Sequence, residues 1–199
     1  MTFQRMTIHA VLGLGIAVGL SFGYGQFSNG LSAAPLQDLQ HTLYLDTKDG
    51  RVTIQLRPDL APKHVIQIEA LTKRGFYNGL VFHRVIDGFM AQTGDPTGTG
   101  MGKSDLPNIP AEFSAEPFTR GTVGMARSQD PDSANSQFFI CFADAAFLNN
   151  KYTVIGQVIS GMDVVDKIKK GAKEANGAVT APDKIVKMQL AAAAAGSKK

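Results

Sequence analysis

The fold and the chemistry of this chain are decided by two stretches, FHRVIDGFMAQTGDPTGTG at residues 82–100 and NSQFFICFA at residues 135–143. The first stretch places Arg84 near apolar residues and near the amide of Gln92, and the second places Gln137 before two phenylalanines. Together they supply a cation, two amides and apolar surface, without a nucleophile, an acid–base pair or a metal-binding cluster. A site of this composition suits a reaction in which no covalent bond is made or broken.

Short runs with alternating or β-branched residues surround these stretches. They predict strands at residues 41–46, 51–56, 80–86, 89–93, 122–126, 137–143, 152–159 and 184–190. Asp49-Gly50 predicts a hairpin turn between the first two strands, and the glycine- and proline-rich residues 94–110 predict a loop. Two short helices are expected, at residues 62–75 and 162–170. This pattern favours a closed antiparallel barrel with helices over its ends, and by itself it also allows a sandwich.

The two stretches resemble the two signature segments of the cyclophilins, the cyclosporin-binding peptidyl-prolyl cis–trans isomerases. The similarity extends from about His41 to about Leu190. The resemblance implies a mainly β fold, namely a closed eight-stranded antiparallel β-barrel capped by two α-helices, with a binding groove on its outer face. It also implies that the chain accelerates rotation about X–Pro bonds, with proline-containing unfolded or partly folded polypeptides as partners. No metal and no other cofactor is expected.

Carrying the family's site across residue by residue gives each motif residue a role. Arg84 is implied as the catalytic arginine, and Gln92 as a residue that helps to hold Arg84 and the substrate carbonyl. The substrate-binding positions that the resemblance implies are Phe89, Met90, Gly98, Ala126, Arg127, Gln137, Phe139, Phe147, Leu148 and Tyr152. Of these, Phe89, Met90, Phe139 and Leu148 are implied to line the pocket for the proline ring.

Three positions depart from the commonest eukaryotic pattern of the family. Phe147 stands where that pattern has tryptophan, Tyr152 stands where it has histidine, and Arg127-Ser128 stands where it has Asn-Ala. Phenylalanine and tyrosine still fill a pocket. We therefore expect these departures to change drug affinity and sequence preference more than the reaction.

The same residues also have structural interpretations. His83 is expected to be a packed or hydrogen-bonded residue, and Cys141 a small buried hydrophobe. Strand alternation places Phe138 and Phe139 on opposite faces, so at least one of them should lie in the core.

The alternative function is a non-catalytic module that binds proline-containing segments. The complete set of arginine and phenylalanine residues favours the isomerase, because a pure binder has no need of the arginine.

The N-terminal sequence predicts export. Arg5 precedes a nearly uninterrupted apolar run at residues 10–24, which is the layout of a secretory signal; a buried core helix is the alternative. Whether the segment is a cleaved signal or an uncleaved membrane anchor stays open. We therefore divide the chain into a signal or anchor at residues 1–25, a linker at 26–40, the isomerase domain at 41–192 and a disordered tail at 193–199. The domain is expected in the periplasm, free or anchored to the membrane, where it would assist the folding of exported proteins.

The distribution of charge argues against nucleic acid as a partner. The formal net charge is +3, and its excess lies in residues 163–199, which hold 8 Lys and Arg against 4 Asp and Glu. No basic residues are interleaved with aromatics there, so nucleic-acid binding is not expected. We expect the protein to be a monomer.

Overall fold

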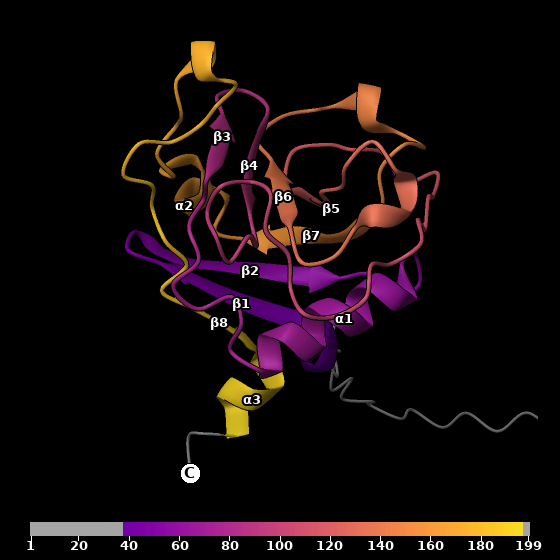
Figure 1. The fold of residues 1–199 in the computed structure, drawn as a ribbon. Helices are drawn as coiled ribbons and strands as arrows, with labels where there is room; N and C mark the ends of the chain where they lie inside the picture. Colours follow the sequence, from indigo (N-terminus) through magenta and orange to yellow (C-terminus); the bar gives the residue numbers. More distant parts are fainter. Residues whose placement is uncertain (1–37, 197–199) are drawn as a thin grey trace, which may run out of the picture. The chain divides into compact units, whose positions relative to one another are not determined.

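The computed structural model of the protein describes residues 38–196, so the predicted signal or anchor and most of the predicted linker lie outside the described residues. The described part contains one antiparallel sheet of eight strands in the order β3-β4-β6-β5-β7-β2-β1-β8. The strands are β1 (Thr42–Thr47), β2 (Gly50–Leu56), β3 (Arg84–Ile86), β4 (Met90–Thr93), β5 (Thr122–Met125), β6 (Phe138–Cys141), β7 (Val154–Ser160) and β8 (Lys187–Leu190). Figure 1 shows their arrangement. The predicted hairpin between β1 and β2 is confirmed, since Thr47 pairs with Gly50.

The sheet is a curled half-barrel that stays open, so the prediction of a closed barrel is wrong. Within residues 38–196 the end strands β3 and β8 share no ladder, and an isolated bridge between Val81 and Lys184 joins the segments that precede them. The outer edge of β3 is paired with residues 171–179 instead. Val85 N–H donates to the Gly177 carbonyl over 2.8 Å, and Gly171 N–H donates to the Val85 carbonyl over 2.9 Å. Because the outward-facing backbone groups of β3 already have partners, they are not available to β8.

Three α-helices accompany the sheet in the described residues, where the sequence predicts two. They are α1 (Pro62–Lys73), α2 (Met162–Asp166) and α3 (Ala191–Gly196). Helix α1 begins at the proline as predicted, because the fixed φ of proline suits the first helical position. Helix α3 covers the beginning of the predicted disordered tail, since its run of alanines has the strongest helix propensity. Residues 197–199 lie outside the described residues.

Several predicted elements are shorter in the structure than in the sequence analysis, and two of them show why. The predicted helix at residues 162–170 ends at Asp166, because Lys169 N–H donates to the Asp183 carboxylate over 2.9 Å and not to a helical carbonyl. The predicted strand at residues 80–86 is regular only over β3, since the residues before it make the isolated bridge described above. In both cases a contact with a distant segment overrides the local pattern.

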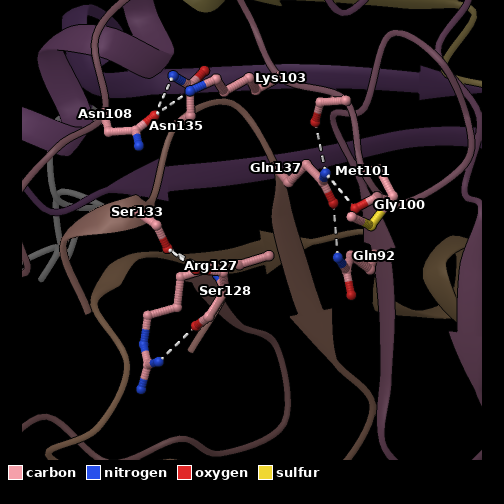
Figure 2. A pocket seen from close by; sticks show the side chains of 12 residues that line it. Gln92, Gly100, Met101, Lys103, Asn108, Arg127, Ser128, Ser133, Asn135 and Gln137 are labelled. Carbon is pink, nitrogen blue, oxygen red and sulfur yellow. Dashed lines mark hydrogen bonds between the residues drawn. The ribbon is translucent and has the colours of Figure 1, made fainter. Parts of the chain in front are cut away.

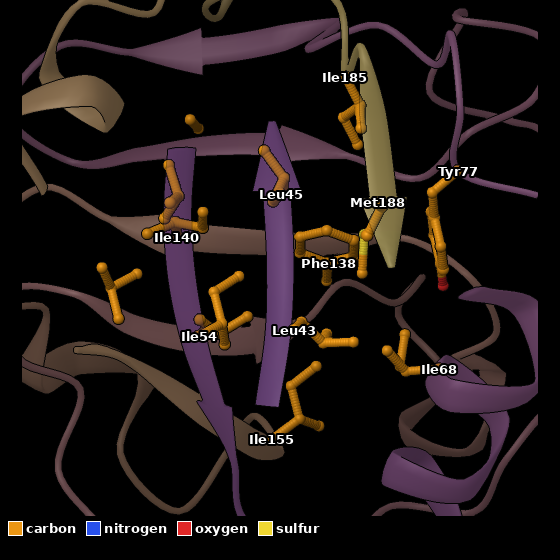
Figure 3. Packing of buried hydrophobic residues seen from close by; sticks show 14 of the residues in the cluster. Leu43, Leu45, Ile54, Ile68, Tyr77, Phe138, Ile140, Ile155, Ile185 and Met188 are labelled. Atoms are coloured by element: carbon orange, nitrogen blue, oxygen red, sulfur yellow. The ribbon is translucent and has the colours of Figure 1, made fainter. Parts of the chain in front are cut away.

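Alternation along β6 divides its apolar side chains between two clusters. Phe138 and Ile140 enter the main core inside the curl of the sheet, where they pack with residues of β1, β2 and α1 (Figure 3). Phe139 and Cys141 enter a second cluster on the other face, together with Met90 of β4. The predicted opposite placement of Phe138 and Phe139 is therefore confirmed, and so is the burial of Cys141. Burial raises the pKa of the Cys141 thiol to about 12, so this thiol stays protonated at neutral pH.

Glu112 fixes the beginning of α1 from a loop that is distant in sequence. The backbone N–H groups of Lys63 and His64 donate to its carboxylate over 3.2 and 3.1 Å, and the His64 ring nitrogen Nδ1 lies 2.7 Å from it. Burial opposes ionisation of Glu112, but the hydrogen bonds from His64 and Lys63 outweigh it and lower the pKa. Burial also lowers the pKa of His64, against the opposing hydrogen bond to Glu112. Both groups therefore bind a proton less readily in the folded state.

We expect acid to destabilise the domain through this pair. A lowered pKa contributes stability that is complete above the ordinary pKa, which is about 6.5 for histidine and 4.3 for glutamate, and that is lost as the pH falls below it. Glu112→Gln should cost about 1–3 kcal/mol of unfolding free energy at pH 7.5, because it removes charged hydrogen bonds. The difference in melting temperature from the wild type should shrink below about pH 4.3. Glu69→Gln is the control, since its partner His41 is more exposed than His64. A difference that does not change with pH would contradict this account.

Candidate active site

A cavity of about 300 Å³ lies on the outer face of the sheet and collects most of the predicted site residues. Strand β3 supplies Arg84, β4 supplies Met90 and Gln92, and β6 supplies Phe139. The cavity is lined by Arg84, Phe89, Met90, Gln92, Ala126, Arg127, Phe139, Phe147, Leu148 and Tyr152. The structure therefore places both predicted catalytic residues and eight of the ten predicted binding residues around one space.

The floor of the cavity is the ring of Phe139. It stacks on Phe118 with ring centroids 5.8 Å apart, and it meets the edge of Tyr152 at 6.1 Å. Gly124 pairs with Phe139 across the β5–β6 ladder, and a Cβ at this glycine would lie 2.6 Å from the Phe139 ring. The absence of a side chain at position 124 therefore gives the floor its position. Sequence reasoning missed Gly124 and Phe118, because nothing local marks their contact with the ring.

Two loops close the sides of the cavity. Phe147 contacts Phe89 with ring centroids 5.2 Å apart, and 62% of Phe147 remains exposed. The guanidinium of Arg127 lies 4.4 Å from the centroid of the Tyr152 ring and donates to the Lys151 carbonyl over 2.9 Å. Arg127 thus links the loop after β5 to the loop before β7.

Arg84 is held by three uncharged oxygen atoms. Its Nη1 donates to Gln92 Oε1 over 3.2 Å, its Nε donates to the Asn176 carbonyl over 3.1 Å, and its Nη2 donates to Asn176 Oδ1 over 3.0 Å. Burial lowers the pKa of Arg84, and Tyr152 opposes this shift. An arginine nevertheless stays charged in proteins. The side chain therefore presents a full positive charge at the edge of an apolar cavity.

Gln92 and Gln137 connect this arginine to a second cavity of about 470 Å³ (Figure 2). Gln92 Nε2 donates to Gln137 Oε1 over 2.8 Å, and Gln137 Nε2 donates to the carbonyls of Gly100 and Gly102 over 3.0 and 2.8 Å. Gln137 lines this neighbouring cavity and not the first one. The predicted binding residue Gly98 lies on the same loop but lines neither of these two cavities. Gly100 and Gly102 of this loop line the second cavity.

His83 is buried beside the site but not part of it. The residue is 8% exposed, neither ring nitrogen has a hydrogen-bond partner among the described residues, and burial lowers the pKa of the ring. His83 is therefore a packed, uncharged residue, as its structural interpretation predicts. In the same range, 38–196, no group of three or more His, Cys, Asp or Glu side chains is arranged to hold a metal ion.

The arrangement can hold an apolar ring on aromatic and aliphatic side chains with a fixed cation at the rim.

Comparison with known proteins shows which family the chain resembles in sequence. The family model described as "Cyclophilin type peptidyl-prolyl cis-trans isomerase/CLD" matches residues 42–190. A probable peptidyl-prolyl cis-trans isomerase of Brucella suis is 55% identical over 196 residues, which cover 93% of this chain and 97% of that protein. A peptidyl-prolyl cis-trans isomerase of Helicobacter pylori is 42% identical over 141 residues, covering 68% of this chain and 86% of that protein.

Solved structures show the same relationship. A cyclophilin from Hirschia baltica superimposes with a TM-score of 0.69 at 28% identity, covering 77% of this chain and 74% of that one. A cyclophilin-type isomerase from Cryptosporidium parvum, solved in the presence of the dipeptide Ala-Pro, gives a TM-score of 0.69 at 27% identity and covers 75% of this chain and 98% of that one. With the motif residues gathered around one cavity and the family model matched from β1 to β8, the chain belongs to the cyclophilin-type peptidyl-prolyl cis–trans isomerases.

Proposed function

We propose that this isomerase rotates X–Pro bonds in the 300 Å³ cavity, with Arg84 as its catalytic residue. The observation that carries the proposal is the position of the guanidinium, which is charged, bound by uncharged oxygen atoms, and placed at the rim of an aromatic cavity. Phe89, Met90, Phe139 and Leu148 offer the proline ring apolar contacts. Proline-containing unfolded or partly folded polypeptides are the proposed substrates.

The reaction needs a donor that binds the twisted amide more tightly than the planar one. Amide resonance sets a barrier of about 18–20 kcal/mol to rotation. In the twisted transition state the proline nitrogen regains a lone pair, which accepts a hydrogen bond that the planar nitrogen cannot accept. An N–H of Arg84 directed at this nitrogen therefore stabilises the transition state selectively. The arginine suits this role because its guanidinium is rigid and permanently charged.

The arginine cannot supply the whole acceleration. An increase of about 10⁵ in rate requires roughly 7 kcal/mol, and one hydrogen bond to a charged group contributes about 1.5–3 kcal/mol. The remainder has to come from holding the proline ring away from water while the preceding segment rotates. The aromatic floor serves this purpose, since Phe139 is 5% exposed and its position is fixed by Gly124.

We expect Arg84→Ala to reduce kcat/KM for a short X–Pro peptide by about 10²–10³, equivalent to about 2.7–4 kcal/mol, because the donor to the proline nitrogen is lost. The fold should be retained, since the side chain lies at the rim of a cavity. Arg51→Ala is the matched control, because that arginine pairs with Asp46 on the β1–β2 hairpin. A coupled isomerisation assay measures both variants. Full activity of Arg84→Ala would refute the assigned role, and an inactive wild type would favour the binding-module function.

Phe147 is expected to weaken inhibition by cyclosporin. The tryptophan that cyclosporin-sensitive relatives have at this position can donate an indole N–H to the drug, whereas phenylalanine has no donor. An unpaired buried polar group costs about 1–3 kcal/mol, or roughly 5- to 150-fold in affinity. Phe147→Trp should therefore bind the drug more tightly with little change in turnover. Titration of both proteins in the same peptide assay measures this, and equally tight inhibition would exclude position 147 as the cause.

The proposed setting is the folding of exported proteins by a monomeric domain. It rests on the sequence of residues 1–25, with Arg5 before an apolar run. In residues 38–196 there is no helix that is long and apolar enough to cross a membrane. Whether the first segment is removed or stays in the membrane as an anchor decides between a free and a tethered enzyme.

Fractionation of native cells is expected to place the protein in the periplasmic or the membrane fraction. N-terminal sequencing of the recovered protein then separates the two outcomes, because a cleaved signal leaves a new terminus near residue 25 or residue 34 and an anchor leaves the segment in place. Recovery from the cytoplasm alone, with Met1 retained, would contradict export.

A further inference from the structure

We propose that Asn176 is a positioning residue that fixes the orientation of Arg84 for catalysis. This inference rests on the proposed role of Arg84. Asn176 follows Arg84 by 92 positions, and its two oxygen atoms contact two nitrogens of the same guanidinium. The backbone carbonyl accepts from Nε over 3.1 Å, and Oδ1 accepts from Nη2 over 3.0 Å. One residue thus binds one side of the guanidinium at two points.

This two-point contact determines which N–H groups remain for a substrate. A guanidinium has five N–H donors. Asn176 accepts two of them and Gln92 accepts a third, from Nη1. The two that are left belong to Nη1 and Nη2, at the end of the side chain. Fixing the plane of the guanidinium therefore fixes the direction in which these donors point.

Asn176 is well suited to this position because of its backbone conformation. Its φ is 52° and its ψ is 35°, which is the left-handed region. Asparagine tolerates this region better than most residues. The conformation directs the carbonyl and the side-chain oxygen to the same guanidinium, so the backbone and the side chain act together. An alanine here would lose Oδ1 and would also strain the backbone.

The segment that carries Asn176 is fixed against β3. Val179 N–H donates to the His83 carbonyl over 3.1 Å, next to the bonds of Val85 described above. A Cβ at Gly177 would lie 2.5 Å from the Ile86 side chain, so the backbone can approach β3 this closely only at a glycine. The position of Asn176 relative to Arg84 is therefore set by the edge of the sheet and not by a free loop.

The contact is also neutral. The acceptors from Asn176 and Gln92 are amide and carbonyl oxygens, so they orient the arginine without reducing its charge. A carboxylate in the same place would orient the side chain equally well, but it would compensate the charge that the transition state needs. This distinguishes a positioning contact for catalysis from the ion pairs elsewhere on the surface, such as Arg120 with Asp166.

Asn176→Gly tests the proposal, because glycine keeps the backbone conformation and the carbonyl contact and removes only Oδ1. We expect kcat to fall about 10-fold, which corresponds to about 1.4 kcal/mol, with KM changed less than about 2-fold because the ring-binding residues are untouched. Asn176→Ala should lose as much kcat and should also melt at a lower temperature. Ala181→Gly is the matched control, since Ala181 has the same φ of 52° and lines neither of the two cavities, and it should leave kcat unchanged.

The Arg84→Ala background separates this inference from the proposed function. In a variant that already lacks Arg84, Asn176→Gly should not lower the residual rate further, because Asn176 affects catalysis only by orienting Arg84. Asn176→Gly with full kcat would overturn the proposal while leaving Arg84 as the catalytic residue. An equal loss in the Arg84→Ala background would also overturn it, since it would show a general structural effect. An Arg84→Ala variant with full activity would instead refute the proposed function itself.

Discussion

The outer edge of β3 is the constraint on which the site depends. An edge strand presents backbone N–H and C=O groups that need partners. Here residues 171–179 provide them, through Gly171, Gly177 and Val179. The same pairing leaves the half-barrel open between β3 and β8, and it brings Asn176 to the guanidinium of Arg84. The open seam of the sheet and the held arginine are thus two results of one set of backbone hydrogen bonds.

The strands of the site contribute one face to the main core and the other face to the cavity. In β6, Phe138 anchors the main core while Phe139, one residue later, forms the floor of the cavity. Movement of the floor would therefore require movement of the core. Ordinary core packing, at about 1.5–3 kcal/mol for each large side chain buried, supports the binding surface. The cavity is rigid at its floor, and its exposed rim at Phe147 can vary without disturbing the fold.

Much of this arrangement is predictable from the sequence, for identifiable reasons. Strand alternation separates Phe138 from Phe139, and the two signature segments contain Arg84, Gln92 and three more of the ten residues that line the cavity. Long-range contacts are not predictable in this way. The Asn176-Gly177 pair signals a turn, but nothing in it indicates a contact with β3. The openness of the sheet and the early end of α2 have the same cause, since each depends on a pairing between distant segments.

The separation of Arg84 and Asn176 along the chain affects when the site can form during synthesis. Polypeptides emerge from the ribosome, or from a translocation channel, with the N-terminus first. All residues that line the cavity are available once the chain has emerged up to Tyr152, but the arginine lacks Asn176 until the last part of the chain arrives. Strand β8 follows later still and pairs with β1, near the start of the domain. Because the main core also includes Met188 and Leu190 of β8, the productive geometry arises only when nearly the whole domain is present.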